Sequence, residues 1–143
     1  NKEEGIALIR QAAQTGNPDA ELFLGICYAK GNGVEENLSL SVQWVHRAAV
    51  KGHAPAQKWL GDCFTRGDGV LVNPAAAAKW YYKSAVQGFP SAQKRLADCL
   101  FEGWGIAEDK QEAAEWYLRA AQQGNKEAQE LLQKYYYSGN QEK

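Results

Sequence analysis

The chain has 143 residues with 16 lysines and arginines against 17 aspartates and glutamates, so its formal net charge is −1. Both signs are interspersed, which argues against a nucleic-acid-binding surface, because phosphate recognition requires clustered basic residues. No apolar run reaches about 18 residues, so the sequence predicts no membrane span. Methionine is absent even at position 1, and we interpret the chain as a processed form or a fragment.

One unit of 36 residues recurs along the chain without insertion or deletion, as the glycines at 16, 52, 88 and 124 illustrate. Such a period is typical of repeat proteins, in which each unit packs on its neighbours. We expect one domain over residues 1–143, and a monomer. It begins with a half unit (1–16), either trimmed upstream or an N-terminal cap. Three whole units follow (17–52, 53–88 and 89–124). We interpret the terminal helix with its polar tail (125–143) as a natural C-terminal cap, the alternative being a truncated unit.

Each whole unit is predicted to form two helices joined by a short loop. In the unit 53–88, the first helix runs from about Pro55 to Arg66, and Gly67 supplies a left-handed C-cap. The second helix runs from about Pro74 to Gln87. Residues of N-capping type precede the second helices, and a glutamate three positions later suggests a capping box at the first and last of them. These residues are Asn1, Asn37, Asn73 and Asp109, with Glu4 and Glu112 as the glutamates.

Glycine stands inside two of the first helices, at Gly25 and Gly61. A glycine within a helix costs about 1 kcal/mol relative to alanine, so we expect a packing reason. Close approach of the paired helix would supply it, because a Cβ atom there would clash. Ala97 suits the same role in the third unit, whereas Gln133 does not suit it in the terminal helix.

The repeat carries the pattern A-x-x-x-L-G-x-x-[YF]-x-x-G-x-G-V followed by A-x-x-W-x-x-x-A-A-x-x-G. In the first whole unit these positions are Ala20, Leu24, Gly25, Tyr28, Gly31, Gly33 and Val34, then Trp44, Ala48, Ala49 and Gly52. The pattern resembles the Sel-one-like repeat (SLR) family, a relative of the tetratricopeptide repeat. The resemblance implies an all-α, right-handed superhelical α-solenoid of helix-turn-helix hairpins. It also implies a non-catalytic adaptor that binds a protein or peptide.

The sequence predicts no enzyme, no metal site and no cofactor. His46 and His53 lie in no catalytic or metal-binding motif, and no C-x-x-C pair occurs. The cysteines Cys27, Cys63 and Cys99 share one register position, and neighbouring equivalent helices lie too far apart for a disulfide. We therefore expect free, buried thiols.

An alternative follows from a set of cysteine-rich bacterial SLR proteins, secreted proteins that are associated with β-lactam binding and weak β-lactam hydrolysis. Those proteins carry a second cysteine in each repeat, which bridges the two helices. Here Ala48, Ser84 and Ala120 occupy the inner positions of the second helices, which argues against this activity. The resemblance is compatible with a bacterial protein that is secreted, periplasmic or cytoplasmic.

Positions that differ between repeats indicate where a partner binds. On the first helices these positions share one face, and the family resemblance implies that this face lines a concave groove. Such a groove would hold about ten extended residues. Trp104 replaces a polar loop residue, and we expect it to be either an exposed anchor for a partner or a lid over a neighbouring helix end. The predicted groove residues are Leu22, Ile26, Lys58, Asp62, Thr65, Lys94, Asp98, Phe101, Lys134 and Tyr137.

Overall fold

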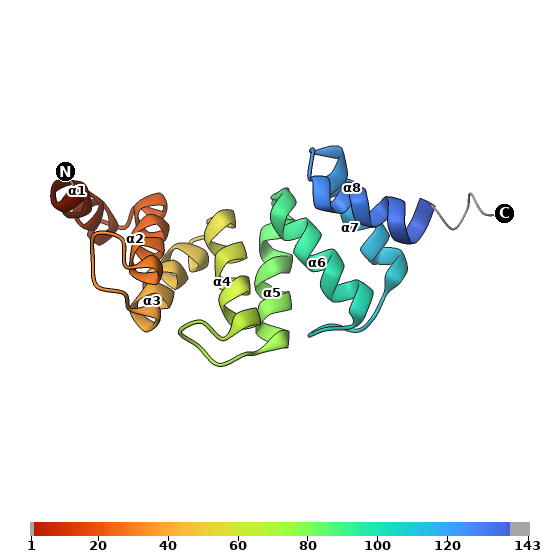
Figure 1. The fold of residues 1–143 in the computed structure, drawn as a ribbon, viewed down its shortest axis with the longest axis horizontal. Helices are drawn as coiled ribbons and strands as arrows, with labels where there is room; N and C mark the ends of the chain where they lie inside the picture. Colours follow the sequence, from red (N-terminus) through yellow and green to blue (C-terminus); the bar gives the residue numbers. More distant parts are fainter. Residues whose placement is uncertain (1, 138–143) are drawn as a thin grey trace. The chain divides into compact units, whose positions relative to one another are not determined.

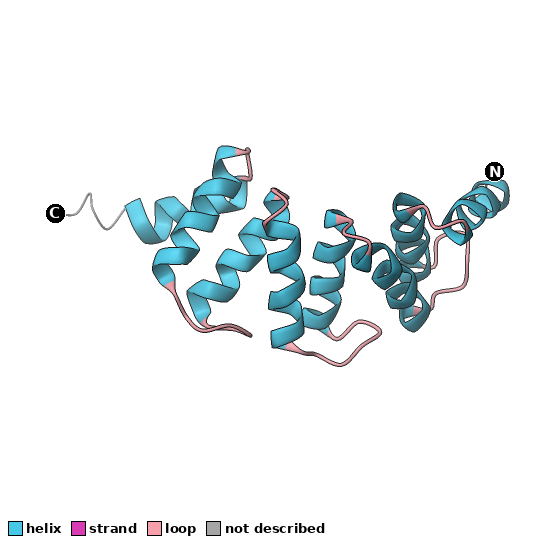
Figure 2. Ribbon diagram, turned by 180° about the vertical axis from the view of Figure 1, so that it is seen from behind, coloured by secondary structure: helices cyan, strands magenta, loops and turns pink. Residues whose placement is uncertain are grey.

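The computed structural model describes residues 2–137, and this part of the chain contains eight α-helices, one π-helical turn and no strand (Figures 1 and 2). The chain divides into two compact units, Asn1–Asn73 and Pro74–Lys143. The predicted all-helical repeat is confirmed. In chain order the elements are α1 (Lys2–Gln14), α2 (Pro18–Lys30), α3 (Leu38–Val50), α4 (Ala54–Arg66), α5 (Pro74–Ala85), α6 (Pro90–Glu102), α7 (Lys110–Gln122), α8 (Lys126–Leu132) and η1 (Gln133–Tyr137).

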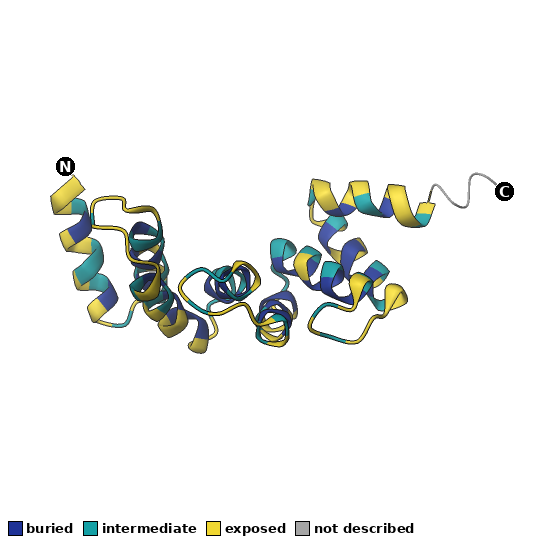
Figure 3. Cartoon of the chain, turned by 60° about the horizontal axis from the view of Figure 1, so that its bottom comes forward, coloured by how far each residue is buried: buried dark blue, intermediate teal, exposed yellow. Residues whose placement is uncertain are grey.

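In the first unit each helix packs against the next along the chain, α1 on α2, α2 on α3 and α3 on α4. The repeating leucines form the centre of the core, since Leu24 and Leu60 are fully inaccessible to solvent, as is Val45 of α3. Each helix buries one side and exposes the other (Figure 3). This one-sided burial is what apolar residues at helical spacing predict.

The second unit follows the same rule, with α5 on α6, α6 on α7, α7 on α8, and η1 continuing from α8. Its core contains larger aromatic side chains, because Tyr81, Trp116 and Tyr117 are buried, as is Leu96. Each tryptophan of a second helix is followed three residues later by an arginine or lysine whose cation lies over its ring. The guanidinium of Arg119 lies 4.4 Å from the centre of the Trp116 ring, and Arg47 and Lys83 hold the same relation to Trp44 and Trp80.

Helix ends follow the predicted capping chemistry with one exception. Gly31, Gly67 and Gly103 all adopt the left-handed conformation and donate their N–H to a cysteine carbonyl one turn earlier. Asn37 and Asp109 are confirmed as N-caps. Asn1 lies outside the described residues. The N-cap at Asn73 and the capping box with Glu4 stay predictions. The capping box at Glu112 is wrong: its carboxylate accepts a hydrogen bond from the Trp116 indole instead, and the Asp109 N–H donates to the Leu100 carbonyl.

The glycine inside α2 marks a close approach between helices, as predicted. A Cβ atom at Gly25 would lie 2.6 Å from Cγ2 of Val45 and 3.0 Å from the Ser41 carbonyl oxygen, both in α3. Its counterpart Ala97 is fully buried, and Gln133 is exposed. Gly61 is buried, and the reason for a glycine there stays a prediction.

The terminal element differs from the single helix predicted for residues 125–139. Its α-helical part, α8, ends at Leu132, and the chain continues as the wider turn η1 to Tyr137. The tyrosines of this turn contact α6 and α7: the Tyr135 ring lies 5.0 Å from that of Phe101, and the Tyr136 hydroxyl donates to the Lys110 carbonyl. The end of the predicted terminal helix and its polar tail, residues 138–143, lie outside the described residues.

Candidate functional site

The predicted groove residues of the first unit lie on α2 and α4, and we call this surface the first-helix face. Leu22 and Ile26 are half-buried on α2, and Thr65 is exposed on α4. Lys58 and Asp62 form an ion pair within α4, with Nζ 2.7 Å from Oδ2. Asp62 is buried, so these two charges bind each other rather than standing as separate charges in the solvent.

Arg66 adds a second cation to this pair. Its guanidinium lies 3.6 Å from the Asp62 carboxylate and also 3.6 Å from that of Asp68 in the following loop. Since 60% of the Arg66 side chain is exposed, these pairs are solvent-screened and contribute little to stability. They do hold the guanidinium at the C-terminal end of α4.

In the second unit, the first-helix face comprises the predicted residues of α6 and η1. Lys94 lies between two carboxylates, with Nζ 2.8 Å from Asp98 and 3.1 Å from Glu127. Burial lowers the pKa of Lys94, but the hydrogen bonds and charges of Asp98 and Glu127 outweigh this effect and raise it. Asp98 also accepts a hydrogen bond from the Tyr117 hydroxyl. The charged side chains of the first-helix face therefore pair with neighbouring side chains in the second unit as well.

The aromatic residues predicted for this face differ in accessibility. Phe101 is half-buried, with the Tyr135 ring at 5.0 Å and the Lys110 ammonium at 5.1 Å from its ring centre. Tyr137 remains 44% exposed, and Lys134 is exposed with its ammonium near the Tyr135 ring. Trp104 is half-buried in the loop between α6 and α7, where its backbone N–H donates to the Cys99 carbonyl.

A pocket of about 210 Å³ opens among α2, α3 and α4 of the first unit, and we call it the α2–α4 pocket. Sequence reasoning missed it, because most of its residues belong to helix faces expected to pack. Burial, assisted by the negative charge of Asp68, raises the pKa of the Cys63 thiol in its wall to about 11. The thiol is thus uncharged at neutral pH. The lining residues are Ala29, Leu38, Ser41, Trp59, Cys63, Arg66 and Asp68.

The three cysteines are free and buried, as predicted. Ala48, Ser84 and Ala120, the inner residues of the second helices, are fully buried as well. Residues 2–137 contain no cluster of histidine, cysteine and carboxylate side chains able to hold a metal ion. Within the same range no helix is both long and apolar enough to cross a membrane.

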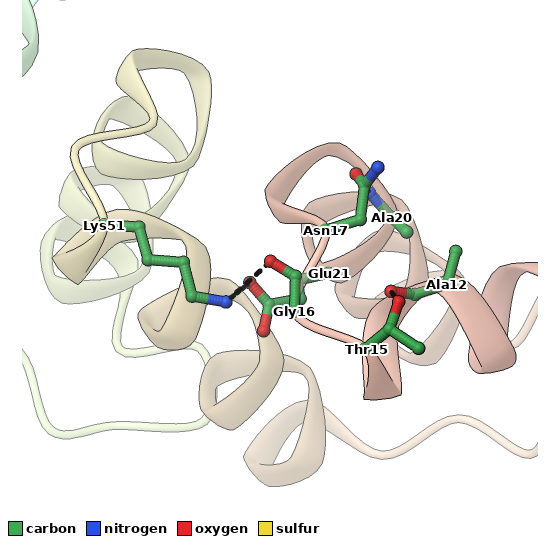
Figure 4. A network of polar contacts seen from close by, with 7 residues as sticks. All are labelled: Ala12, Thr15, Gly16, Asn17, Ala20, Glu21 and Lys51. Carbon is green, nitrogen blue, oxygen red and sulfur yellow. Dashed lines mark hydrogen bonds and ion pairs between the residues drawn. The ribbon is translucent and has the colours of Figure 1, made fainter.

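A buried carboxylate and a partly exposed ammonium pair at the corner between repeats in the first unit (Figure 4). Glu21 is 2% exposed and accepts a hydrogen bond from the Lys51 ammonium at 2.8 Å. The same ammonium donates to the Gly16 carbonyl at 2.9 Å. In the second unit the equivalent positions are Gln93 and Gln123, whose amides meet at 2.8 Å.

The Sel1 repeat model matches residues 18–53, 54–89 and 90–125, with the predicted 36-residue period. The chain therefore belongs to the Sel1 repeat family, whose members are generally non-catalytic repeat scaffolds and often mediate protein interactions. None of the curated proteins matches the chain.

Solved structures share the fold. A Sel1 repeat protein from Oxalobacter formigenes is 35% identical with a TM-score of 0.85, covering 92% of this chain and 98% of its own. A protective antigen of uropathogenic Escherichia coli strains, which displays an SLR fold, is 36% identical with a TM-score of 0.90; the match covers 94% of this chain but only 29% of that protein. Helicobacter pylori cysteine-rich protein B is 18% identical with a TM-score of 0.74 over 91% of this chain and 96% of its own, a likeness of fold alone.

Proposed function

We propose that the protein is a non-catalytic interaction module that binds an extended peptide segment of a protein partner on its first-helix faces. The observation that carries this proposal is the contrast between positions within each first helix. Those that pack against the second helix repeat in type, as Leu24 and Leu60 do, whereas those with partly or fully exposed side chains vary along the chain. Ile26 and Thr65 are examples. A scaffold that repeats its core and varies one face suits the recognition of a non-repeating sequence.

The internal pairing of the charges supports a peptide ligand over a strongly charged one. Lys58 and Lys94 are each neutralised by an aspartate one turn later on the same helix. Binding energy would then come from apolar and hydrogen-bonding contacts rather than from a net field. We do not propose the β-lactam alternative, because the cysteines are free.

A displayed library of random dodecapeptides, selected on the whole chain, tests the proposal. We expect enrichment of peptides that bind in the micromolar range. The double variant Ile26→Lys plus Thr65→Lys should weaken them at least tenfold, because both side chains belong to the first-helix face. Its matched control is Gln43→Lys plus Val50→Lys, which makes one polar and one apolar substitution at exposed positions of α3.

Circular dichroism must show equal helicity for both double variants before their affinities are compared. The control should bind within threefold of the unaltered chain. Failure to enrich any peptide would overturn peptide binding. A greater loss in the control pair would move the binding surface to the second helices.

A further inference from the structure

The α2–α4 pocket has an internal counterpart, because the same repeat positions recur 72 residues, or two periods, later in the second unit. Ala29 of α2 corresponds to Phe101 of α6, and Cys63 of α4 corresponds to Tyr135 of η1. The two rings contact each other, with centroids 5.0 Å apart and planes inclined by 40°. Two aromatic rings thus stand in the second unit where the first unit has an alanine and a thiol beside a pocket.

The other residues that line the pocket can be compared with the second unit in the same way. Leu38, which is 37% exposed, corresponds to Lys110, whose ammonium lies 5.1 Å from the Phe101 ring. In the first unit the nearby cation is Arg66, which lines the pocket. Both sites therefore combine a cation with a space suited to an aromatic ring, an arrangement that favours cation–π contact.

We propose that the α2–α4 pocket binds one aromatic side chain, phenylalanine or tyrosine, of the partner peptide. The inference rests on the proposed function and adds to it a specific anchor. A cavity of about 150 Å³ is enough to hold benzene, so a pocket of about 210 Å³ accommodates a phenyl or phenol ring. Trp59 offers the incoming ring an aromatic partner, and the uncharged Cys63 thiol adds a soft apolar wall.

Other classes of ligand fit less well. The Arg66 guanidinium is shared between two carboxylates, Asp62 and Asp68, so the pocket offers no unneutralised cation to an anion. The Ser41 hydroxyl and the Asp68 carboxylate are acceptors that a tyrosine hydroxyl can use. An aromatic side chain buried in a well-packed pocket is also a common form of binding hot spot.

Single blocked amino acids test the pocket without any knowledge of the partner. N-acetyl-phenylalaninamide and N-acetyl-tyrosinamide are titrated into the whole ¹⁵N-labelled chain at millimolar concentrations. We expect saturable shifts of the Trp59 indole N–H and of the Ala29 and Ser41 amides. N-acetyl-alaninamide should produce none. Absence of shifts with both aromatic probes would overturn the inference.

Two variants each replace a lining residue of the pocket by the residue at the equivalent position of the second unit. Ala29→Phe introduces the residue found at position 101 and should lower probe affinity at least tenfold by occupying the pocket with its own ring. Ala7→Phe, at an exposed position of α1, is the matched control and should stay within twofold. If Ala29→Phe proves unfolded by circular dichroism, Trp59→Leu, which copies Leu131, should lower the affinity by removing the aromatic wall; unchanged affinity would contradict the proposal.

The selected dodecapeptides separate this inference from the proposed function. Enriched peptides that share an aromatic residue and lose at least tenfold in affinity to Ala29→Phe support both. Peptides that bind without an aromatic residue, and equally well to Ala29→Phe, overturn the pocket while the interaction module stands. Probe shifts at Trp59 without any enriched peptide support the pocket and overturn peptide binding as the function.

Discussion

The three-helix set α2–α4 of the first unit and the set α6–α8 with η1 of the second share one repeat but differ in how they close their first-helix face. Phe101 and Tyr135 cover this face in the second unit, whereas Ala29 and Cys63 leave a pocket in the first. The repeat determines the backbone, and the side chains at a few register positions decide whether a site is open. A repeat protein can therefore carry a binding pocket in one unit and a closed surface in another.

The helix contact beneath this face differs in the same way. In the first unit Gly25 meets Val45, and Ile26 beside it is apolar. In the second unit the equivalents of Val45 and Ile26 are Tyr117 and Asp98, which are joined by a hydrogen bond. The first unit thus relies on close packing of apolar groups, and the second on a larger side chain with a polar contact.

The largest expected effect concerns the close packing at Gly25. Gly25→Val should lower the free energy of unfolding by about 2–4 kcal/mol, because the added Cβ atom lies within 3.0 Å of α3 and this overpacking outweighs the better helix propensity of valine relative to glycine. Gln133→Val, at an exposed position of η1, should change it by less than about 1 kcal/mol. Chemical denaturation of both variants measures the difference, and equal losses would contradict the packing explanation.

A smaller effect is expected at the polar corner. Glu21→Ala should lower the free energy of unfolding by about 1–3 kcal/mol, because it removes the buried acceptor of the Lys51 ammonium. Glu21→Gln should cost less than about 1 kcal/mol. An amide at this register position donates to a carbonyl eight residues earlier in the other repeats, as Gln93 does to Ala85.

Transferring the pair to the second unit sharpens this comparison. Gln93→Glu alone should destabilise the chain, since it places a carboxylate in a buried site without a cation. Adding Gln123→Lys should restore most of the loss by recreating the pair formed by Glu21 and Lys51. Chemical denaturation of Gln93→Glu, Gln123→Lys and the double variant measures the free energy of unfolding of each. If the double variant loses as much unfolding free energy as the two single variants together, the two pairs are not equivalent.

The smallest effect is a difference in alkaline stability between the two sets. Burial raises the pKa of Tyr117 above its ordinary value of 10.0, and the hydrogen bond to Asp98 raises it further. Its stabilising contribution is therefore complete below about pH 10 and is lost as the pH rises further, by at most about 1.4 kcal/mol per pH unit. Tyr117→Phe should show a shallower decline of unfolding free energy above pH 10.

The buried thiols provide the reference for this titration. Burial raises the pKa of Cys99 to about 12 and that of Cys63 to about 11, both from 9.0. Their contribution declines from about pH 9 upward in both the unaltered chain and Tyr117→Phe. Identical stability profiles for the two proteins between pH 9 and 11 would contradict a role for the tyrosine.

Much of this molecule is determined by local sequence. The 36-residue period, the left-handed glycine caps at Gly31, Gly67 and Gly103, and the N-caps Asn37 and Asp109 follow from short-range chemistry that is the same in every repeat. The glycine inside α2 was also interpretable, because a helix tolerates glycine only for a reason such as close packing. The free, buried cysteines followed from their shared register.

Tertiary structure alone decided the properties that depend on which side chains meet across helices. The π-helical turn at the end of the chain brings Tyr135 and Tyr136 onto Phe101, contacts between residues more than 30 positions apart that no helical periodicity encodes. The α2–α4 pocket likewise depends on the distances among three helices. Ala29 shares the variable face with Phe101 but was not among the predicted groove residues, because an alanine signals nothing until its neighbours leave space around it.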